Sequence, residues 1–124
     1  MSAVKGIGTD LVEITRIAAA IDKHGERFAR RILTEPESAR IGCSDPRALA
    51  KAFAAKEAVA KALGTGFQQG IGWQDIEVSR NALGAPVVTL SGAAAARMLE
   101  LGGRDVLLSL SDEHTHALAF AVMT

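Results

Sequence analysis

Two carboxylates and a lysine have the types and the spacing for chemistry on a phosphate group. Glu57 and Lys61 are four residues apart in an alanine-rich stretch, so a helix would present both side chains to the same neighbour. Asp10 follows two glycines in the segment 6–10 (GIGTD), where small residues let another backbone or a ligand come close. Mg²⁺ binds one or two carboxylates and fills its other positions with water and phosphate oxygens. Asp10 and Glu57 are therefore candidate ligands of a Mg²⁺ ion that would bridge a diphosphate, with Lys61 as a positive group beside it.

The stretch that carries Glu57 reads as one long helix over residues 46–66. Asp45 and Pro46 supply an N-cap and a first helical residue, and Gly64 sits where a left-handed residue ends a helix. Lys56 falls inside the apolar arc of this helix, so its side chain must either reach the rim or meet an anion. Pattern alone also fits an ordinary solvated face with one Glu-Lys pair.

Strands are expected at both ends of the chain and helices between them. A strand over residues 3–14 would direct Asp10 to the same side as Gly8 and Val12, as a ligand or as a strand-end cap. Thr15 is expected to cap the next helix, Gly25 to interrupt it, and Thr34 to cap a short one. Two hairpins are expected, one through residues 76–90 and one around residues 112–116. The prediction is a small α+β domain, residues 1–124, of antiparallel strands with helices packed on the sheet.

Basic residues gather between residues 16 and 31, although the whole chain has 14 basic and 14 acidic residues. This segment is either a solvated basic face or a dock for an acidic partner, with Phe28 among its apolar anchors.

Balanced charge and few aromatic residues argue against nucleic acid as a partner. No segment is long and apolar enough to predict a membrane span. Cys43 is the only cysteine, which favours the cytoplasm. His114 and His116 fit a polar turn better than a metal site.

Two of these stretches together, GIGTDLVEI (residues 6–14) and FAAKEAVAKALGTG (residues 53–66), resemble the signature pair of the bacterial holo-[acyl carrier protein] synthases, the AcpS-type 4′-phosphopantetheinyl transferases. The resemblance extends over essentially the whole chain. It implies a Mg²⁺-dependent enzyme that transfers 4′-phosphopantetheine from coenzyme A to a serine of apo acyl carrier protein and releases adenosine 3′,5′-bisphosphate. It also implies a homotrimer with sites between subunits. The sequence leaves open whether the acceptor serves fatty-acid biosynthesis or a secondary pathway.

The resemblance also implies roles for individual residues. Asp10 and Glu57 would hold the metal, and Lys61 would lie near the phosphates as a third catalytic residue. Coenzyme A would contact Lys51, Lys56, Lys61, Gly64, Gly84, Pro86, Ser109 and Asp112. The hairpin residues of this set would come from the adjacent subunit. The carrier protein would contact Arg16, Arg27, Phe28 and Arg31.

The chain departs from the family pattern at three positions, and at one of them Asp112 stands where some relatives have a histidine, with His114 two residues away. Ala52 stands where many relatives have a basic residue, and whether Lys51 replaces it at the 3′-phosphate is open. Ala85 stands at the middle of a turn that usually reads Gly-Lys-Pro. Two alternatives to the enzyme are a coenzyme A-binding module without turnover and a structural trimer with solvated charges.

Overall fold

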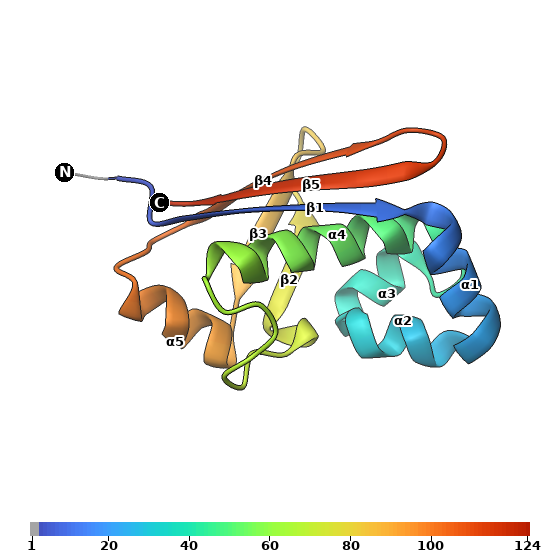
Figure 1. The fold of residues 1–124 in the computed structure, drawn as a ribbon, viewed down its shortest axis with the longest axis horizontal. Coiled ribbons are helices and arrows are strands. Elements are labelled where there is room, and N and C mark those ends of the chain that lie inside the picture. Colours follow the sequence, from blue (N-terminus) through green and yellow to red (C-terminus); the bar gives the residue numbers. More distant parts are fainter. Residues whose placement is uncertain (1–2) are drawn as a thin grey trace.

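The computed structural model describes residues 3–124, in which helices pack around a three-stranded and a two-stranded antiparallel sheet (Figure 1). In chain order the elements are β1 (Gly6–Glu13), α1 (Ile14–His24), α2 (Glu26–Ile32), α3 (Glu35–Ile41), α4 (Pro46–Ala62), the 3₁₀ helix η1 (Trp73–Asp75), β2 (Ile76–Arg80), β3 (Pro86–Leu90), α5 (Gly92–Glu100), β4 (Val106–Asp112) and β5 (His116–Met123). The predicted α+β class is therefore confirmed. The predicted domain also includes residues 1 and 2, which lie outside the described residues.

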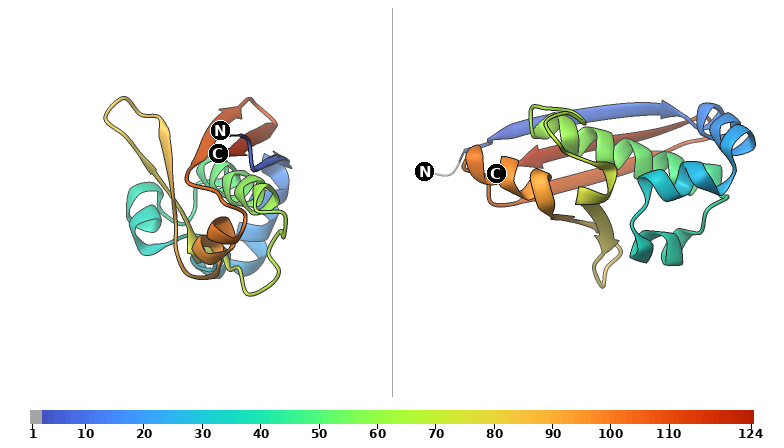
Figure 2. Two further views of the ribbon diagram at one scale, coloured as in Figure 1. Left: turned by 90° about the vertical axis from the view of Figure 1, so that its left-hand side faces the viewer. Right: turned by 90° about the horizontal axis from the view of Figure 1, so that it is seen from below.

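The larger sheet has the strand order β1-β5-β4, so the strand that comes last in the sequence lies in the middle. The register places Asp10 opposite Ala119 and Gly8 opposite Ala121. Helix α4 lies along one face of this sheet (Figures 1 and 2). The helix therefore contacts the first and the last strand at once.

Small residues let α4 approach the sheet closely. Ala117, Ala119 and Ala121 of β5 are fully buried, and Gly6 and Gly8 of β1 lie against the backbone of α4. A Cβ atom at Gly8 would collide with the carbonyl oxygen of Ala58. Because glycine has no side chain, it is the residue that permits this approach.

The start of α4 follows the sequence signals, whereas its end at Ala62 comes four residues before the predicted end at residue 66. The carboxylate of Asp45 accepts hydrogen bonds from the N–H groups of Arg47 and Ala48, and Pro46 begins the helix. Gly64 follows the C-cap with a φ of 79°, as predicted for a left-handed residue. The predicted cap at Thr15 is wrong, because β1 runs directly into α1 and Glu13 takes the N-cap position without a side-chain hydrogen bond.

The smaller sheet is the β2–β3 hairpin, which projects from the rest of the molecule (Figure 2). Asn81 holds its turn, because its side-chain oxygen accepts hydrogen bonds from the N–H groups of Leu83 and Ala85. Gly84 has a φ of 87°, a conformation that favours glycine. The hairpin therefore presents a fixed tip away from its own core.

The face of the larger sheet opposite to α4 is apolar and exposed. Its large side chains are Ile7, Leu11, Leu107, Leu118 and Phe120, of which Leu11 is 62% exposed. Within residues 3–124, no helix covers this face (Figure 1). Contiguous exposed apolar surface of this kind marks interaction sites.

Among the helices of residues 3–124, none has the length and apolarity needed to cross a membrane.

Candidate active site

Asp10, Glu57 and Lys61 lie together where β1 meets α4. The ammonium of Lys61 donates to the carbonyl oxygen of Thr9 at 2.9 Å and lies 3.4 Å from one carboxylate oxygen of Asp10. Glu57 is one turn earlier on α4 and is partly buried. The predicted convergence of a strand residue with two helix residues is thus present in one chain.

Burial raises the pKa of both carboxyl groups at this site. For Asp10, desolvation is the main cause, and it outweighs the opposing charges of Lys61 and Arg16. For Glu57, desolvation again raises the pKa, and the neighbouring charge of Asp10 raises it further. The charged forms of both carboxyl groups are therefore disfavoured, and a bound cation would stabilise them.

One oxygen of Asp10 has the environment of a metal ligand. Its Oδ2 atom is buried and has no hydrogen-bond partner, while the side chain as a whole is only 15% exposed. A buried acceptor without a partner is costly, so it points to a group that binds there. Within residues 3–124 no three potential ligands gather, so an ion held by Asp10 and Glu57 would take its other ligands from water and substrate, as Mg²⁺ does. The donor set therefore fits Mg²⁺.

A second charged cluster lies at the N-terminal end of α4. Asp112, at the end of β4, is 3.0 Å from the guanidinium of Arg47 and 3.5 Å from the ammonium of Lys51. The hydrogen bond from Arg47 is the main cause that lowers the pKa of Asp112. Lys51 and Asp112, both predicted to contact coenzyme A, are thus adjacent. Arg47, which has no role in the sequence prediction, joins them.

A cavity of about 160 Å³ adjoins this cluster between α3, α4, β2 and β4. Lys51, Arg40 and Arg80 supply positive charge to its lining, and Ala52 leaves space in it. This cavity does not adjoin the carboxylates of Asp10 and Glu57, because Asp10 lies on β1 and the cavity lies beside β4, at the opposite edge of the sheet. Lys51 and Glu57 also point about 120° apart around α4, being six residues apart.

The remaining predicted coenzyme A contacts are dispersed over the chain. Gly84 and Pro86 lie in the projecting β2–β3 hairpin, and Ser109 lies on the outer face of the sheet, paired with Phe120. Gly64 lies at the end of α4, close to Lys61. One chain therefore does not gather the full predicted set around the carboxylates.

Lys56 is the predicted contact that the structure places elsewhere. Its side chain is fully buried, and its ammonium lies 2.7 Å from Glu37 inside the protein. Burial lowers the pKa of Lys56, and Glu37 opposes that shift. Of the two alternatives in the sequence, meeting an anion is the one found. A direct contact of Lys56 with coenzyme A conflicts with this position.

Three of the four predicted docking residues are brought together on α2. Arg27, Phe28 and Arg31 line a cavity of about 190 Å³ with His24. Phe28 and Arg31 also line a neighbouring cavity whose wall includes Phe53 of α4, one turn before Glu57. Arg16 lies apart from this cavity and contributes its charge near Asp10. Basic and apolar groups thus continue from α2 toward the carboxylates.

Sequence reasoning missed Glu37, Arg47 and His24. Glu37 was hidden by its position three residues after Thr34, where a capping box explains a glutamate without any further role. The capping box is present, and the same carboxylate also meets Lys56. His24 and Arg47 carried no signal beyond their charge.

Comparisons with known proteins give the chain its family. Residues 6–121 match the model of the 4′-phosphopantetheinyl transferase superfamily. The holo-[acyl-carrier-protein] synthase of Shewanella amazonensis is 50% identical over 123 residues, which are 98% of each chain. The crystal structure of the synthase from Neisseria meningitidis is 40% identical, with a TM-score of 0.90 over 98% of this chain and 99% of that one.

A third comparison includes a ligand. The synthase from Helicobacter pylori, whose structure is a complex with coenzyme A, is 30% identical, with a TM-score of 0.85 over 95% of this chain and 99% of that one. The residues that match the family model, 6–121, include β1 and α4, which carry Asp10, Glu57 and Lys61. The chain belongs to the 4′-phosphopantetheinyl transferase superfamily and, within it, to the holo-[acyl-carrier-protein] synthases.

Proposed function

We propose that this chain is a Mg²⁺-dependent holo-[acyl-carrier-protein] synthase, which transfers 4′-phosphopantetheine from coenzyme A to a serine of apo acyl carrier protein. The observation that carries the proposal is the buried, unpartnered Asp10 oxygen beside Glu57 and Lys61. Full-length relatives named as this synthase, and a relative in complex with coenzyme A, support the reaction and the donor. The lone Cys43 agrees with the cytoplasmic location that the sequence predicts.

The acidic residues of the site would bind the metal, and the basic residue would contact the phosphate. Asp10 and Glu57 would hold Mg²⁺, which stabilises negative charge on a diphosphate and on its leaving group. Lys61 adds a positive donor for the phosphate oxygens once Asp10 has another partner. The serine oxygen would form a new bond to phosphorus and give its proton to a base or to water, while the diphosphate bond breaks and adenosine 3′,5′-bisphosphate leaves.

The acceptor docks on α1 and α2 in this proposal. An acidic carrier protein would meet Arg27 and Arg31, and Phe28 would provide an apolar anchor between them. Arg16 lies nearer to Asp10 and would guide the acidic partner toward the site. The order of these groups along the surface leads from the dock to the carboxylates.

The active assembly is a homotrimer in this proposal, with each site between two subunits. The apolar outer face of the sheet supports an assembly, because exposed large side chains gather on it. The opposite placement of Asp10 on β1 and Asp112 on β4 supports shared sites, because a second copy can bring its β4 edge and its β2–β3 hairpin to the carboxylates. A contact between unlike edges forms a closed ring when the rotation closes.

The test is intact mass spectrometry of an apo acyl carrier protein incubated with the enzyme, coenzyme A and Mg²⁺. We expect a gain of one phosphopantetheine that disappears when the metal is chelated. Glu57→Gln should lower the rate by about 100-fold or more, since losing about 3 kcal/mol of charge stabilisation has that effect. Glu100→Gln is the matched control, because Glu100 is an exposed glutamate of α5 far along the chain from these groups.

Two results would contradict the proposal. Full activity of Glu57→Gln would remove Glu57 from the reaction. Binding of coenzyme A without transfer to any of several acceptors would identify a binding module instead of a transferase.

A further inference from the structure

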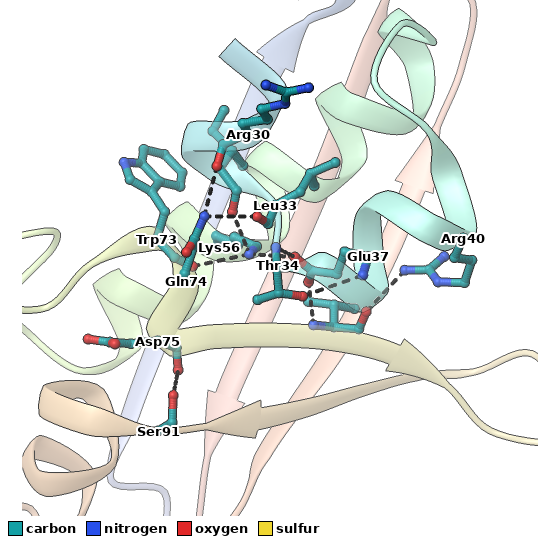
Figure 3. Close-up of polar contacts among 12 residues, drawn as sticks. Arg30, Leu33, Thr34, Glu37, Arg40, Lys56, Trp73, Gln74, Asp75 and Ser91 are labelled. Atoms are coloured by element: carbon teal, nitrogen blue, oxygen red, sulfur yellow. Dashed lines mark hydrogen bonds and ion pairs between the residues drawn. The ribbon is translucent and has the colours of Figure 1, made fainter. Parts of the chain in front are cut away.

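A buried ion pair lies behind the active-site helix. The ammonium of Lys56 is 2.7 Å from Oε1 of Glu37, and the two side chains are 0% and 2% exposed (Figure 3). Lys56 directly precedes Glu57 in α4, so this helix sends one charged side chain into the protein and the next one toward the active site. The position of the buried ammonium therefore constrains the position of the active-site carboxylate.

Lys56 connects α4 to three other segments. Its ammonium donates to the carbonyl oxygen of Ile32 at 2.7 Å, to that of Trp73 at 3.1 Å, and to Glu37 of α3 (Figure 3). These bonds use all three hydrogens of the ammonium group. Ile32 ends α2, the helix that carries the acceptor dock, and Trp73 begins η1, which leads into β2.

Glu37 extends the connection to the hairpin. Its second oxygen accepts a hydrogen bond from the N–H of Val78 in β2 at 2.6 Å, and its first oxygen also accepts from the N–H of Thr34. Both oxygens are therefore occupied by buried donors. A single pair of side chains joins the active-site helix, the end of the docking helix and the base of the projecting hairpin.

Stability alone gives little reason for this arrangement. Dehydrating two charges is costly, and replacing a buried ion pair with well-packed apolar groups is often neutral or stabilising. A fully bonded ammonium differs from an apolar contact in being directional, because each hydrogen bond fixes the distance and the angle of its acceptor.

We propose that Lys56 and Glu37 are positioning residues that hold Glu57 and Lys61 at a fixed distance from the acceptor dock on α2. This inference rests on the proposed function, because it takes α2 as the dock and Glu57 as a metal ligand. Coenzyme A binding depends less on the pair, since Lys51 and Arg47 bond to Asp112 and not to Lys56 or Glu37, although Glu37 and Val78 also line the cavity that adjoins this cluster. Loss of the pair should therefore affect the use of the carrier protein more than the use of coenzyme A.

The test is the double variant Lys56→Met with Glu37→Gln, which removes both charges and retains an acceptor for the Val78 N–H. We expect kcat to fall about 10-fold and KM for the carrier protein to rise about 10-fold, because displacements of about 1 Å have large effects on rate. KM for coenzyme A should stay within about 2-fold. Glu37→Asp is the second variant, because it keeps the charges balanced and shortens the reach by one methylene; it should change the same parameters in the same direction.

Val59→Ala is the matched control, since Val59 is buried on the same helix outside the network. All variants are assayed where circular dichroism shows that they are fully folded. A double variant whose kcat and KM values equal those of Val59→Ala would overturn the positioning role. An equal rise in both KM values would overturn it too. Absence of transfer by the unaltered protein would instead refute the proposed function.

Discussion

At the scale of single residues, Asp10 carries a carboxylate in a place that suits a cation. Its folded-state pKa lies above its ordinary value because of burial, so the folded protein holds the proton more tightly than the unfolded chain does. The stability that this provides is present below the unfolded pKa and is lost as the pH rises through the folded pKa. At neutral pH and without metal, the ionised Asp10 therefore lowers the stability of the fold.

Asp10→Asn should accordingly raise the melting temperature of metal-free protein at pH 7.5 by a few degrees. The difference should shrink toward pH 4, where the wild-type carboxyl group is increasingly protonated. Added Mg²⁺ should stabilise the wild type and leave the variant unchanged, because binding to the folded state alone raises stability. Thermal melts by circular dichroism, with chelator and with Mg²⁺, measure all three effects.

Asp112→Asn is the control for Asp10→Asn, because the pKa of Asp112 is shifted in the opposite direction. The hydrogen bond from Arg47 holds the pKa of Asp112 below its ordinary value, so its contribution is present above the unfolded pKa and is lost as the pH falls. This variant should not raise the melting temperature at pH 7.5. Equal stabilisation by both variants would mean that general charge, and not the burial of Asp10, explains the effect.

The grouping of Asp10 with Glu57 and Lys61 was implied by the resemblance to the family, and two simple periodicities agree with it. Strand alternation set the side of Asp10, and the four-residue helical spacing aligned Glu57 with Lys61. The partner of Lys56 was beyond such reasoning. Glu37 lies 19 residues away in another helix, and only the tertiary fold brings the two together.

At the scale of elements, the contact between α4 and β1 depends on the absence of side chains. Gly8→Ala places a Cβ atom against the backbone carbonyl of Ala58, which has no rotamer with which to avoid it. We expect a severe loss of stability, about 3 kcal/mol or more, comparable to other overpacked cores. The residual folded protein should transfer phosphopantetheine slowly, because moving α4 outward separates Glu57 from Asp10.

Gly72→Ala is the control for this contact. A Cβ atom at Gly72 meets nothing within 4 Å, and its φ of −106° is open to any residue. Urea denaturation and turnover should both be close to the wild type for this variant. A tolerated Gly8→Ala would show that α4 does not need its close approach to β1.

Element boundaries were predictable where a side chain marked them. Asp45 and Thr34 bond to the first turns of α4 and α3 as their positions indicate, and Gly64, with a positive φ, directly follows the C-cap of α4. At Thr15 the same logic failed, because pairing of β1 with β5 continues to Glu13 and leaves no separate cap before α1. Propensity signals describe isolated helices, whereas here a strand partner determines where the helix begins.

At the scale of the whole molecule, the apolar outer face of the larger sheet is the expected contact between subunits. One charged side chain introduced on this face should therefore dissociate the assembly. Leu11→Asp should convert the proposed trimer to monomers, since a carboxylate buried in an apolar interface has no partner. Sedimentation or light scattering measures the mass, and turnover should fall with it if sites lie between subunits. Leu99→Asp is the control, because Leu99 is 76% exposed but lies on α5. A monomeric wild type, or a Leu11→Asp trimer, would contradict the assembly.

The overall topology was predictable only in outline. Strands at both ends with helices between them are confirmed, and both hairpins lie where their turns indicate. The position of β5 between β1 and β4 was not predicted, because periodicity identifies strands without saying which strands pair. The charge clusters at opposite edges of the sheet follow from that order, so the division of the site between subunits was implied by family resemblance alone.

The central place of β5 also determines when the protein can fold. Every helix and every other strand precedes β5 in the sequence, yet β1 pairs with β5 along its whole length. During synthesis, β1 can pair with β5 only after a strand about 100 residues downstream has been made, and long-range pairing of this kind slows folding. The strand that carries Asp10 therefore gains its hydrogen-bonded partner only after all the other described elements have been made.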